Sequence, residues 1–302
     1  MPQSPELRYE AAAAMSLGQR ELQEDALATD FPHLGPLSFA VLADGMGGHA
    51  AGEIASKIVV TEVFSELKLQ SGDLEHLGEN MNGILMDAAL AANSCVNAQA
   101  ESQPETQGMG ATLLAPVILA DRLFWISVGD SPLYLFRDGD MRQLNEDHSL
   151  APQIDLMADA GLITDDLARV HPDRNCLTSV LVGSQIDRID CPETSVALHP
   201  GDIVLAASDG LQTLDDSQIR TILQSRATRP AHEIADAIMT AVDGCEDPQQ
   251  DNVSICVIKA EPRAETTWRS AGAALAHPGL HVVSDSSFAR GPAKVIQIGD
   301  QP

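Results

Sequence analysis

The 302-residue sequence predicts one large α+β domain whose strands pair in an antiparallel way. Two observations lead to this prediction. Apolar runs of strand length follow one another through short turns, most densely over residues 111–144, where Asp138-Gly139 is a typical two-residue hairpin turn. Segments with a helical spacing of apolar residues come in groups and do not alternate with single strands, which argues against a parallel sheet built from βαβ units.

Nine apolar runs have the length and composition of β-strands. They cover residues 9–16, 37–43, 111–118, 123–128, 133–136, 141–144, 190–198, 202–207 and 253–259. In other segments apolar residues recur at every third or fourth position, which predicts helices. These segments are 51–68, 80–102, 150–160, 215–226 and 230–243.

The composition of the chain changes near residue 260. Residues 261–302 are rich in Ala, Pro, Gly and Ser, and they contain only two short apolar pieces, LHVV and KVIQI. We therefore place the folded domain at residues 1–260 and expect residues 261–302 to form a C-terminal tail, partly disordered or docked onto the domain.

The charge balance excludes one broad class of function. The chain has 18 Lys and Arg residues against 44 Asp and Glu residues, a formal net charge of −26. Proteins that bind nucleic acids in general neutralise phosphates with basic side chains, so no nucleic-acid partner is expected. No apolar stretch is long enough for a membrane span. The five scattered cysteines fit free thiols in a reducing compartment, so the expected location is the cytoplasm.

Acidic residues stand at the ends of several predicted strands. Three apolar runs each end in an aspartate beside a small residue, and further acids come just before strands. The first group is Asp44, Asp130 and Asp209, and the second is Glu24, Asp25 and Asp251. One Asp-Gly pair alone is most simply a turn. Three runs of the same build, with flanking acids, predict carboxylates that converge at one edge of the sheet structure.

Such a cluster of carboxylates predicts a metal site. Neighbouring carboxylates repel one another unless cations neutralise them, and ligands that are all oxygen select hard ions such as Mg²⁺ or Mn²⁺. The glycine-rich stretch 44–53, DGMGGHAAGE, could also form a phosphate-binding loop. No Gly-Lys pair occurs anywhere in the chain, so a Walker A loop is absent.

The sequence resembles the metal-dependent serine/threonine protein phosphatases of the PP2C (PPM) family, bacterial branch. The matching motifs occur in the family's order and cover about residues 8–259. They are GQRELQED (18–25), DGMGGHAAGE (44–53), GATLLA (110–115), VGDS (128–131), LNEDHS (144–149), SDGL (208–211) and DN (251–252). The resemblance implies an α-β-β-α sandwich, in which two antiparallel sheets pack face to face and helices flank them.

The resemblance also implies roles for individual residues. Asp44 would bridge two metal ions, and the carbonyl of Gly45 would bind one of them. Asp209 and Asp251 would hold the other ion. The pair Glu24 and Asp25 would also serve the metal centre, with Asp25 as a ligand and Glu24 acting directly or through water. Arg20 would grip the substrate phosphate, for which its planar guanidinium is suited.

The mechanism implied by the resemblance has no covalent intermediate. Two Mn²⁺ or Mg²⁺ ions per chain would activate a shared water for in-line attack on phosphorus. Bacterial members hold a third ion with the aspartate matching Asp130 and a second aspartate, and Thr213 replaces that second residue here. The resemblance therefore implies at most a weak third site at Asp130.

The expected partners are phosphorylated proteins, including a bacterial serine/threonine kinase or its targets, and the chain is expected to be a monomer. Residues 150–190 correspond to the family's flap beside the active site. The alternative function is a catalytically reduced PP2C-like regulator or phosphoprotein-binding module. The main metal ligands implied by the resemblance are all present, which favours the enzyme, whereas Thr213 keeps the alternative open.

Overall fold

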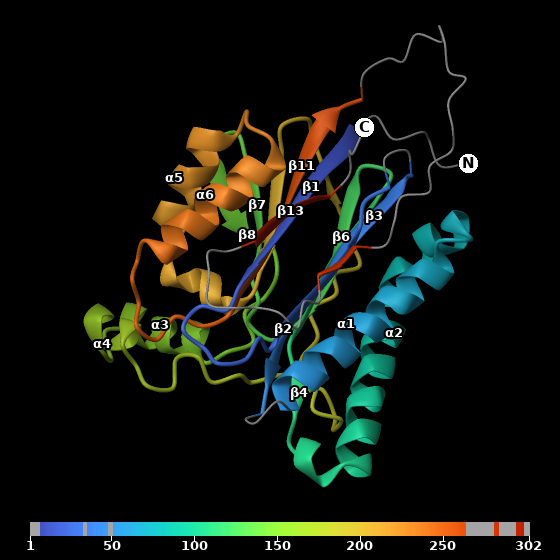
Figure 1. Ribbon diagram of the computed structural model, residues 1–302. Coiled ribbons are helices and arrows are strands. Elements are labelled where there is room, and N and C mark those ends of the chain that lie inside the picture. Colours follow the sequence, from blue (N-terminus) through green and yellow to red (C-terminus); the bar gives the residue numbers. More distant parts are fainter. Residues whose placement is uncertain (1–6, 33–34, 48–50, 264–280, 284–293, 299–302) are drawn as a thin grey trace, which may run out of the picture.

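The protein is a four-layer sandwich in which two β-sheets lie face to face between two pairs of helices. It is seen in a computed structural model that describes residues 7–32, 35–47, 51–263, 281–283 and 294–298. In Figure 1 the two sheets occupy the centre, α1 and α2 cover one side and α5 and α6 cover the other. Both sheets are antiparallel throughout the described residues, so the predicted α+β sandwich is confirmed.

The first sheet has six strands. Their spatial order is β13 (Lys294–Ile298), β1 (Leu7–Ser16), β11 (Val253–Pro262), β10 (Ile203–Ala207), β7 (Leu133–Arg137) and β8 (Asp140–Gln143). The central pair joins the two ends of the domain, because Leu7 lies opposite Pro262 and Ser16 lies opposite Val253. The Asp138-Gly139 turn connects β7 to β8, as the sequence predicts.

The second sheet carries the first acidic motifs. Its order is β12 (His281–Val283), β2 (Asp25–Asp30), β3 (Leu37–Met46), β5 (Leu113–Leu119), β6 (Arg122–Val128) and β9 (Val196–Ala197), and the short β4 (Gly110–Ala111) pairs with β3. Asp25 and Asp44 lie directly opposite each other on β2 and β3. The pairing of these two strands alone therefore brings two of the predicted site residues together.

The helices fall into three groups. Covering the second sheet are α1 (Ala51–Gln70) and α2 (Leu74–Ser102), and covering the first are α5 (Asp216–Arg226) and α6 (Ala231–Asp243). The third group is made of short helices in the segments that link the longer elements along the chain. They are α3 (Ala151–Asp159), α4 (Asp165–Arg169) and the 3₁₀ helices η1 (Pro104–Thr106) and η2 (Asp209–Thr213). In Figure 1, α3 and α4 lie together at the lower left.

Three apolar cores hold these layers together. The middle core fills the space between the sheets with residues such as Met15, Leu42 and Leu114, all at most 2% exposed. The outer cores lie between each sheet and its helices. Because apolar residues on both faces of the strands are buried, each central strand reads as a continuous apolar run in the sequence.

Some predicted elements differ from the structure at their ends. The predicted strand 190–198 is reduced to Val196–Ala197. Asp190 still exchanges two backbone hydrogen bonds with Ser127, at 2.8 and 3.0 Å, but Pro192 lacks the N–H that a continuing ladder requires. The second helix starts at Leu74, earlier than predicted, because the side chain of Asp73 accepts a 3.0 Å hydrogen bond from the backbone N–H of His76.

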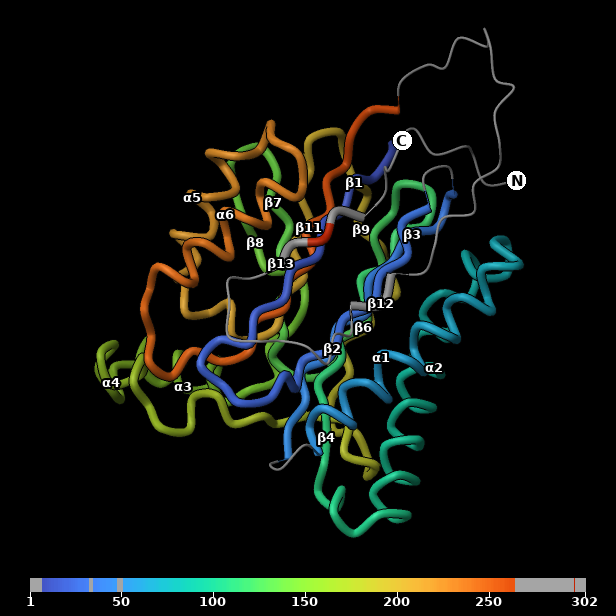
Figure 2. Tube along the Cα trace, viewed as in Figure 1, coloured from blue at the N-terminus to red at the C-terminus, as the bar shows by residue number. Residues whose placement is uncertain are grey.

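The two apolar pieces of the C-terminal segment form edge strands. β13 pairs with β1, and β12 pairs with β2, so each sheet gains one strand from beyond residue 263 (Figure 2). None of the helices in the described part of the chain combines the length and the hydrophobicity needed to cross a lipid bilayer. All five cysteines are free.

Candidate active site

The acidic residues singled out in the sequence meet at one end of the sandwich. Asp25 begins β2, Asp44 lies near the end of β3, and Asp130 follows β6. From the first sheet, Asp209 follows β10 and Asp251 precedes β11. A cavity of about 360 Å³ opens among them. Its lining includes Arg20, Glu24, Asp44, Gly45, Asp130, Asp209 and Asp251.

The backbone around Asp44 is fixed by close neighbours. Its N–H donates to Thr112 Oγ1 at 2.9 Å, and its carbonyl accepts from the N–H of Thr112 at 2.8 Å. The N–H of Gly45 donates to the carbonyl of Glu24 at 3.1 Å. Gly45 is packed so tightly against Gly52, at the start of α1, that a Cβ atom would lie 2.1 Å from the Gly52 carbonyl oxygen. Only glycine fits at this position.

A second group of contacts joins the loop before β2 to the segment before β11. Asn252 Oδ1 accepts from the N–H of Glu24 at 2.7 Å, and Asn252 Nδ2 donates to two carbonyls of the loop, Leu17 at 2.9 Å and Leu22 at 3.1 Å. Arg20 Nη2 donates to Asp251 Oδ2 at 2.5 Å. Asn252 is the second residue of the DN motif, and the structure shows that it organises the loop that carries Arg20 and Glu24.

Burial and mutual repulsion raise the pKa values of the clustered acids. Burial raises the pKa of Asp25 to about 7, although Ser208 Oγ donates a 2.8 Å hydrogen bond to Asp25 Oδ2. Burial, with Asp209 and Asp147 nearby, raises the pKa of Asp130 to about 8. The pKa of Asp44 lies well above its ordinary value, through burial and then the charges of Asp25 and Asp209. Asp147 was not among the residues predicted for this cluster.

The donor set fits hard divalent cations. Three carboxylate oxygens that are fully shielded from water have no hydrogen-bond partner among the described residues, namely Glu24 Oε1, Asp25 Oδ1 and Asp209 Oδ1. Buried carboxylate oxygens without partners are costly unless a proton or a cation neutralises them. The acidic side chains among the described lining residues offer carboxylate oxygens, which Mg²⁺ and Mn²⁺ prefer.

Arg20 offsets part of this charge through its ion pair with Asp251. Besides burial, the charge of Asp209 is one of the causes that raise the pKa of Asp44. Within the described residues, no group of three Asp, Glu, His or Cys side chains has the arrangement of a formed metal site. Metal binding here would require deprotonated carboxylates.

The acid cluster predicts an unusual pH dependence for the stability of the metal-free protein. A carboxyl group whose pKa is higher in the folded than in the unfolded protein contributes stability at low pH. This contribution is lost as pH rises from about 4, the pKa in the unfolded chain, through the pKa in the folded protein. For Asp25 and Asp130 the folded values are about 7 and about 8. We expect the melting temperature in EDTA to fall by on the order of 10 °C between pH 5 and pH 8.

Circular dichroism melts would measure this fall, and Asp130→Asn should flatten the curve. Asp236→Asn, at an exposed position of α6, is the matched control and should leave it unchanged. In Mn²⁺ the melting temperature should rise with pH, because metal binding requires deprotonated carboxylates. A metal-free curve that rises from pH 5 to pH 8 would contradict the prediction.

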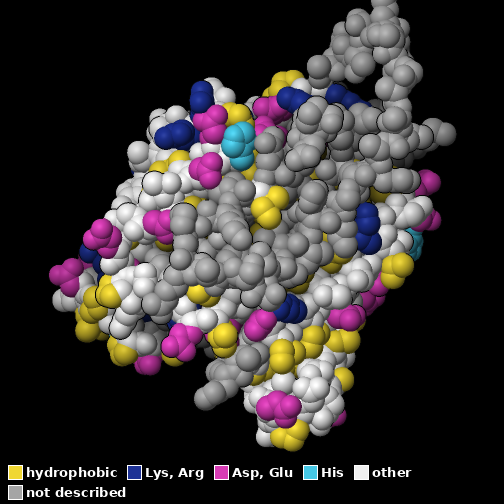
Figure 3. All heavy atoms as spheres, in the orientation of Figure 1, with side chains coloured by type: hydrophobic (Ala, Val, Ile, Leu, Met, Phe, Trp, Pro, Cys, Tyr) yellow, Lys and Arg dark blue, Asp and Glu magenta, His cyan; other side chains and the backbone are white. Residues whose placement is uncertain are grey.

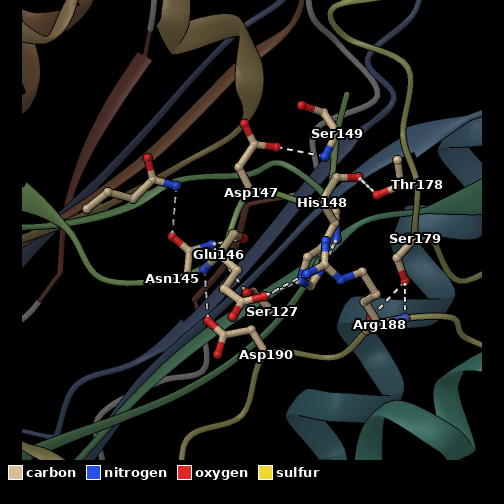
Figure 4. A network of polar contacts seen from close by, with 12 residues as sticks. Ser127, Asn145, Glu146, Asp147, His148, Ser149, Thr178, Ser179, Arg188 and Asp190 are labelled. Atoms are coloured by element: carbon tan, nitrogen blue, oxygen red, sulfur yellow. Dashed lines mark hydrogen bonds and ion pairs between the residues drawn. The ribbon is translucent and has the colours of Figure 1, made fainter. Parts of the chain in front are cut away.

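A polar network supports the wall of the site next to Asp130. Figure 4 shows it running from Asn145–Ser149 to Thr178, Ser179, Arg188 and Asp190. The ring of His148 is fully buried, and its Nδ1 accepts from the N–H of Gly129 at 3.3 Å, while the N–H of His148 donates to the carbonyl of Gly129 at 3.0 Å. Burial lowers the pKa of His148, which keeps this ring neutral. His148 therefore has a structural role beside Asp130.

The chain matches a known family over most of the domain. The family model described as "Protein phosphatase 2C" matches residues 15–251. The chain belongs to the protein phosphatase 2C family. The resemblance inferred from the motifs is thereby confirmed, and the chain is a bacterial-type member of a family of metal-dependent protein serine/threonine phosphatases.

Relatives and solved structures agree with this assignment. Serine/threonine protein phosphatase PstP of Mycobacterium tuberculosis is 36% identical over 189 residues, which are 61% of this chain and 33% of PstP. This chain therefore spans about a third of that relative's length. Serine/threonine phosphatase stp of Listeria monocytogenes serovar 1/2a is 30% identical over 222 residues, 73% of this chain and 84% of stp.

The crystal structure of the Mycobacterium tuberculosis phosphatase PstP superposes with a TM-score of 0.69 and 32% identity, over 84% of this chain and 99% of that one. The catalytic domain of PstP in complex with two manganese ions superposes with a TM-score of 0.65 and 30% identity, covering 84% and 99% of the two chains.

Proposed function

We propose that this chain hydrolyses phosphoserine and phosphothreonine on proteins. The observation that carries the proposal is the cavity, whose described lining residues include five acidic side chains and one basic side chain, Arg20. A phosphorylated side chain needs both kinds of group, since cations and a guanidinium offset the charge of the phosphoryl oxygens during transfer. Family membership supports the same reaction.

The proposed metal ligands are the acids of this cavity. Asp44 would bridge two Mn²⁺ or Mg²⁺ ions, with the carbonyl of Gly45 on one of them and Asp209 and Asp251 on the other. When bound, such ions supply Lewis acidity that makes water nucleophilic near neutral pH and stabilises negative charge on phosphoryl oxygens. The partnerless oxygens of the cluster and the two manganese ions of PstP support this assignment.

Two further residues complete the proposed metal centre. Asp25 lies opposite Asp44 and accepts a 2.8 Å hydrogen bond from Ser208 Oγ, which supports its assignment to the same ions. Glu24 lies against Gly52 at the start of α1, and it would act directly or through water. Asp130 would hold a third ion only weakly, because the residue at position 213 is Thr.

Arg20 would bind the phosphate group of the substrate. Its side chain is about half exposed at the mouth of the cavity and donates to Asp251. A guanidinium has five N–H donors, so it can hold phosphate oxygens in a fork. Binding of a cation by Asp251 would free further donors of Arg20 for the substrate.

The proposed substrates are phosphoproteins of a bacterial serine/threonine kinase, or the kinase itself, since the bacterial relatives are serine/threonine phosphatases. The free thiols support action in the cytoplasm, and we propose a monomer. The retained set of acids supports catalysis over a purely regulatory role.

A phosphatase assay tests the function. Purified protein should release phosphate from a phosphothreonine peptide and from an aryl phosphate in Mn²⁺, and not in EDTA. Arg20→Ala should lower kcat/KM by about 10²-fold, because a charged donor to the phosphoryl group is lost. Arg8→Ala is the matched control, since Arg8 forms a similar exposed 2.5 Å ion pair with Glu261 outside the cavity. Activity that persists in EDTA would disprove the metal-dependent reaction.

A further inference from the structure

Exposed apolar side chains are concentrated beside the active site. Among the described residues nine large hydrophobic side chains are well exposed, and five of them lie within residues 156–170. They are Leu156, Met157, Leu162, Leu167 and Val170. In the space-filling view, hydrophobic and acidic side chains lie together over α3 and α4 at the lower left (Figure 3). We call these five residues the flap patch.

The flap patch is not needed to fold the segment that carries it. Ile154 of α3 and Ala168 of α4 are the buried apolar residues of these helices, at 5% and 2% exposure. By contrast, Leu162 is 71% exposed and Val170 is 75% exposed. A cluster of apolar residues that a short helical segment does not bury is typical of a surface that binds another molecule.

Hydrogen bonds hold the flap patch at a defined place relative to the cavity. Arg174 donates to both carboxylate oxygens of Asp155 on α3, at 2.6 and 2.9 Å. The N–H of Leu150 donates to the carbonyl of Cys176 at 3.0 Å. The next residues along this segment, Asn175 and Leu177, line the active-site cavity. The wall of the cavity and the flap patch are therefore parts of one hydrogen-bonded segment.

The charge around the flap patch defines the chemistry of its partner. Residues 150–174 contain five aspartates and two arginines, and both arginines pair with acids of the same segment. Exposed acids are left over, among them Asp159 and Asp165. Among the described residues that line the cavity, Arg20 is the one basic side chain. An acidic protein segment would be repelled here, whereas Lys or Arg residues on a partner would be attracted.

We propose that the flap patch is a docking surface for the substrate segment next to the phosphorylated residue, and that it selects segments carrying apolar and basic side chains. This inference rests on the proposed phosphatase function and specifies its substrates. The phosphate would enter the cavity while neighbouring apolar side chains cover the patch and neighbouring cations approach Asp159 and Asp165.

Three phosphothreonine peptides test the inference. They share one core and are flanked by Leu and Lys, by Ser and Lys, or by Leu and Glu. For each peptide, kcat/KM is divided by the kcat/KM for an aryl phosphate, which is too small to reach α4. We expect the Leu/Lys peptide to give the highest ratio. In Leu162→Ser/Val170→Ser, the ratio for this peptide should fall about tenfold, as when well-packed interface side chains are truncated. Asp159→Asn/Asp165→Asn should instead reduce the preference for Lys over Glu.

The control for the apolar variant is Leu69→Ser, because Leu69 on α1 is equally exposed, at 76%. Glu75→Gln/Glu79→Gln on α2 is the control for the charge variant. Equal effects of the flap and control variants on the peptide ratio would overturn the inference even if the phosphatase is active.

Binding of the unphosphorylated peptides, followed by fluorescence anisotropy, tests docking without catalysis. We expect Leu162→Ser/Val170→Ser to weaken the binding of the Leu/Lys peptide, whether or not phosphate is released. Sedimentation of the wild-type protein and of this variant tests whether a second copy of the chain covers the flap patch. A dimer that the variant abolishes would show that a second copy covers the flap patch, and it would overturn the inference.

Discussion

Replacing Asp44 by Asn is expected to lower kcat by about 10³-fold or more, because an amide cannot take the place of the carboxylate proposed to bridge two cations. The same change should stabilise the metal-free protein near neutral pH. Asp44 shares its surroundings with Asp25 and Asp209, and burial and their charges raise its pKa. An uncharged side chain removes this repulsion, and we expect the melting temperature in EDTA to rise by on the order of 5 °C.

Activity and thermal melts with and without Mn²⁺ would measure both effects. In the wild type Mn²⁺ should raise the melting temperature strongly, and in Asp44→Asn it should raise it much less. Asp236→Asn on α6 again serves as the control, with unchanged activity and melting temperature. If the variant retained activity, Asp44 would not be an essential metal ligand. If the variant lost stability in EDTA, the neighbouring carboxylates would not be destabilising Asp44 in the metal-free protein.

Replacing Gly45 by Ala is expected to cause one of the largest losses of stability that a single methyl group can produce in this chain. The added Cβ would lie 2.1 Å from the carbonyl oxygen of Gly52 and 2.6 Å from that of Glu24. Both neighbours are backbone atoms, so a side-chain rotation cannot relieve the contact. We expect the free energy of unfolding to fall by about 3 kcal/mol or more.

Urea denaturation would measure the loss, and the phosphatase assay should show that activity falls with it, because Asp44 precedes the displaced residue. Gly83→Ala is a matched control within α2. Apart from its chain neighbours and the nearby backbone of its own helix, no described atom lies within 4 Å of the added Cβ, so the change should stabilise the protein by up to about 1 kcal/mol. A Gly45→Ala protein as stable as the wild type would show that α1 can move away from β3.

Local patterns were sufficient to predict much of this fold. The long helices and the central strands follow from apolar periodicity, and Asp44 and Asp209 are recognisable because each ends a buried strand. The sequence did not predict α4, since its five residues include one buried apolar side chain, Ala168, and show no periodic pattern. The strand β2 is short and begins and ends in aspartate, so it was not among the predicted runs.

Long-range contacts were harder to predict, because no local pattern encodes them. The pairing of Leu7 with Pro262 and the hydrogen bond from Glu24 to Asn252 join opposite ends of the domain. The ion pair between Arg20 and Asp251 is also invisible in the sequence, although both residues were predicted for the site. The flap patch could be found only once burial was known, since the apolar residues of a short helix are usually expected to face the core.

The loop around Gly18 has a consequence for how the protein is made. A Cβ atom at Gly18 would lie 2.2 Å from the carbonyl oxygen of Asp251, and the N–H of Gln19 donates to the carbonyl of Gln250 at 2.8 Å. Arg20 and its partner Asp251 are 231 residues apart in the chain. At roughly 5–20 residues per second, a ribosome needs roughly 10 to 50 s to add the second after the first. A nascent chain therefore has no phosphatase site until synthesis of the domain is almost complete.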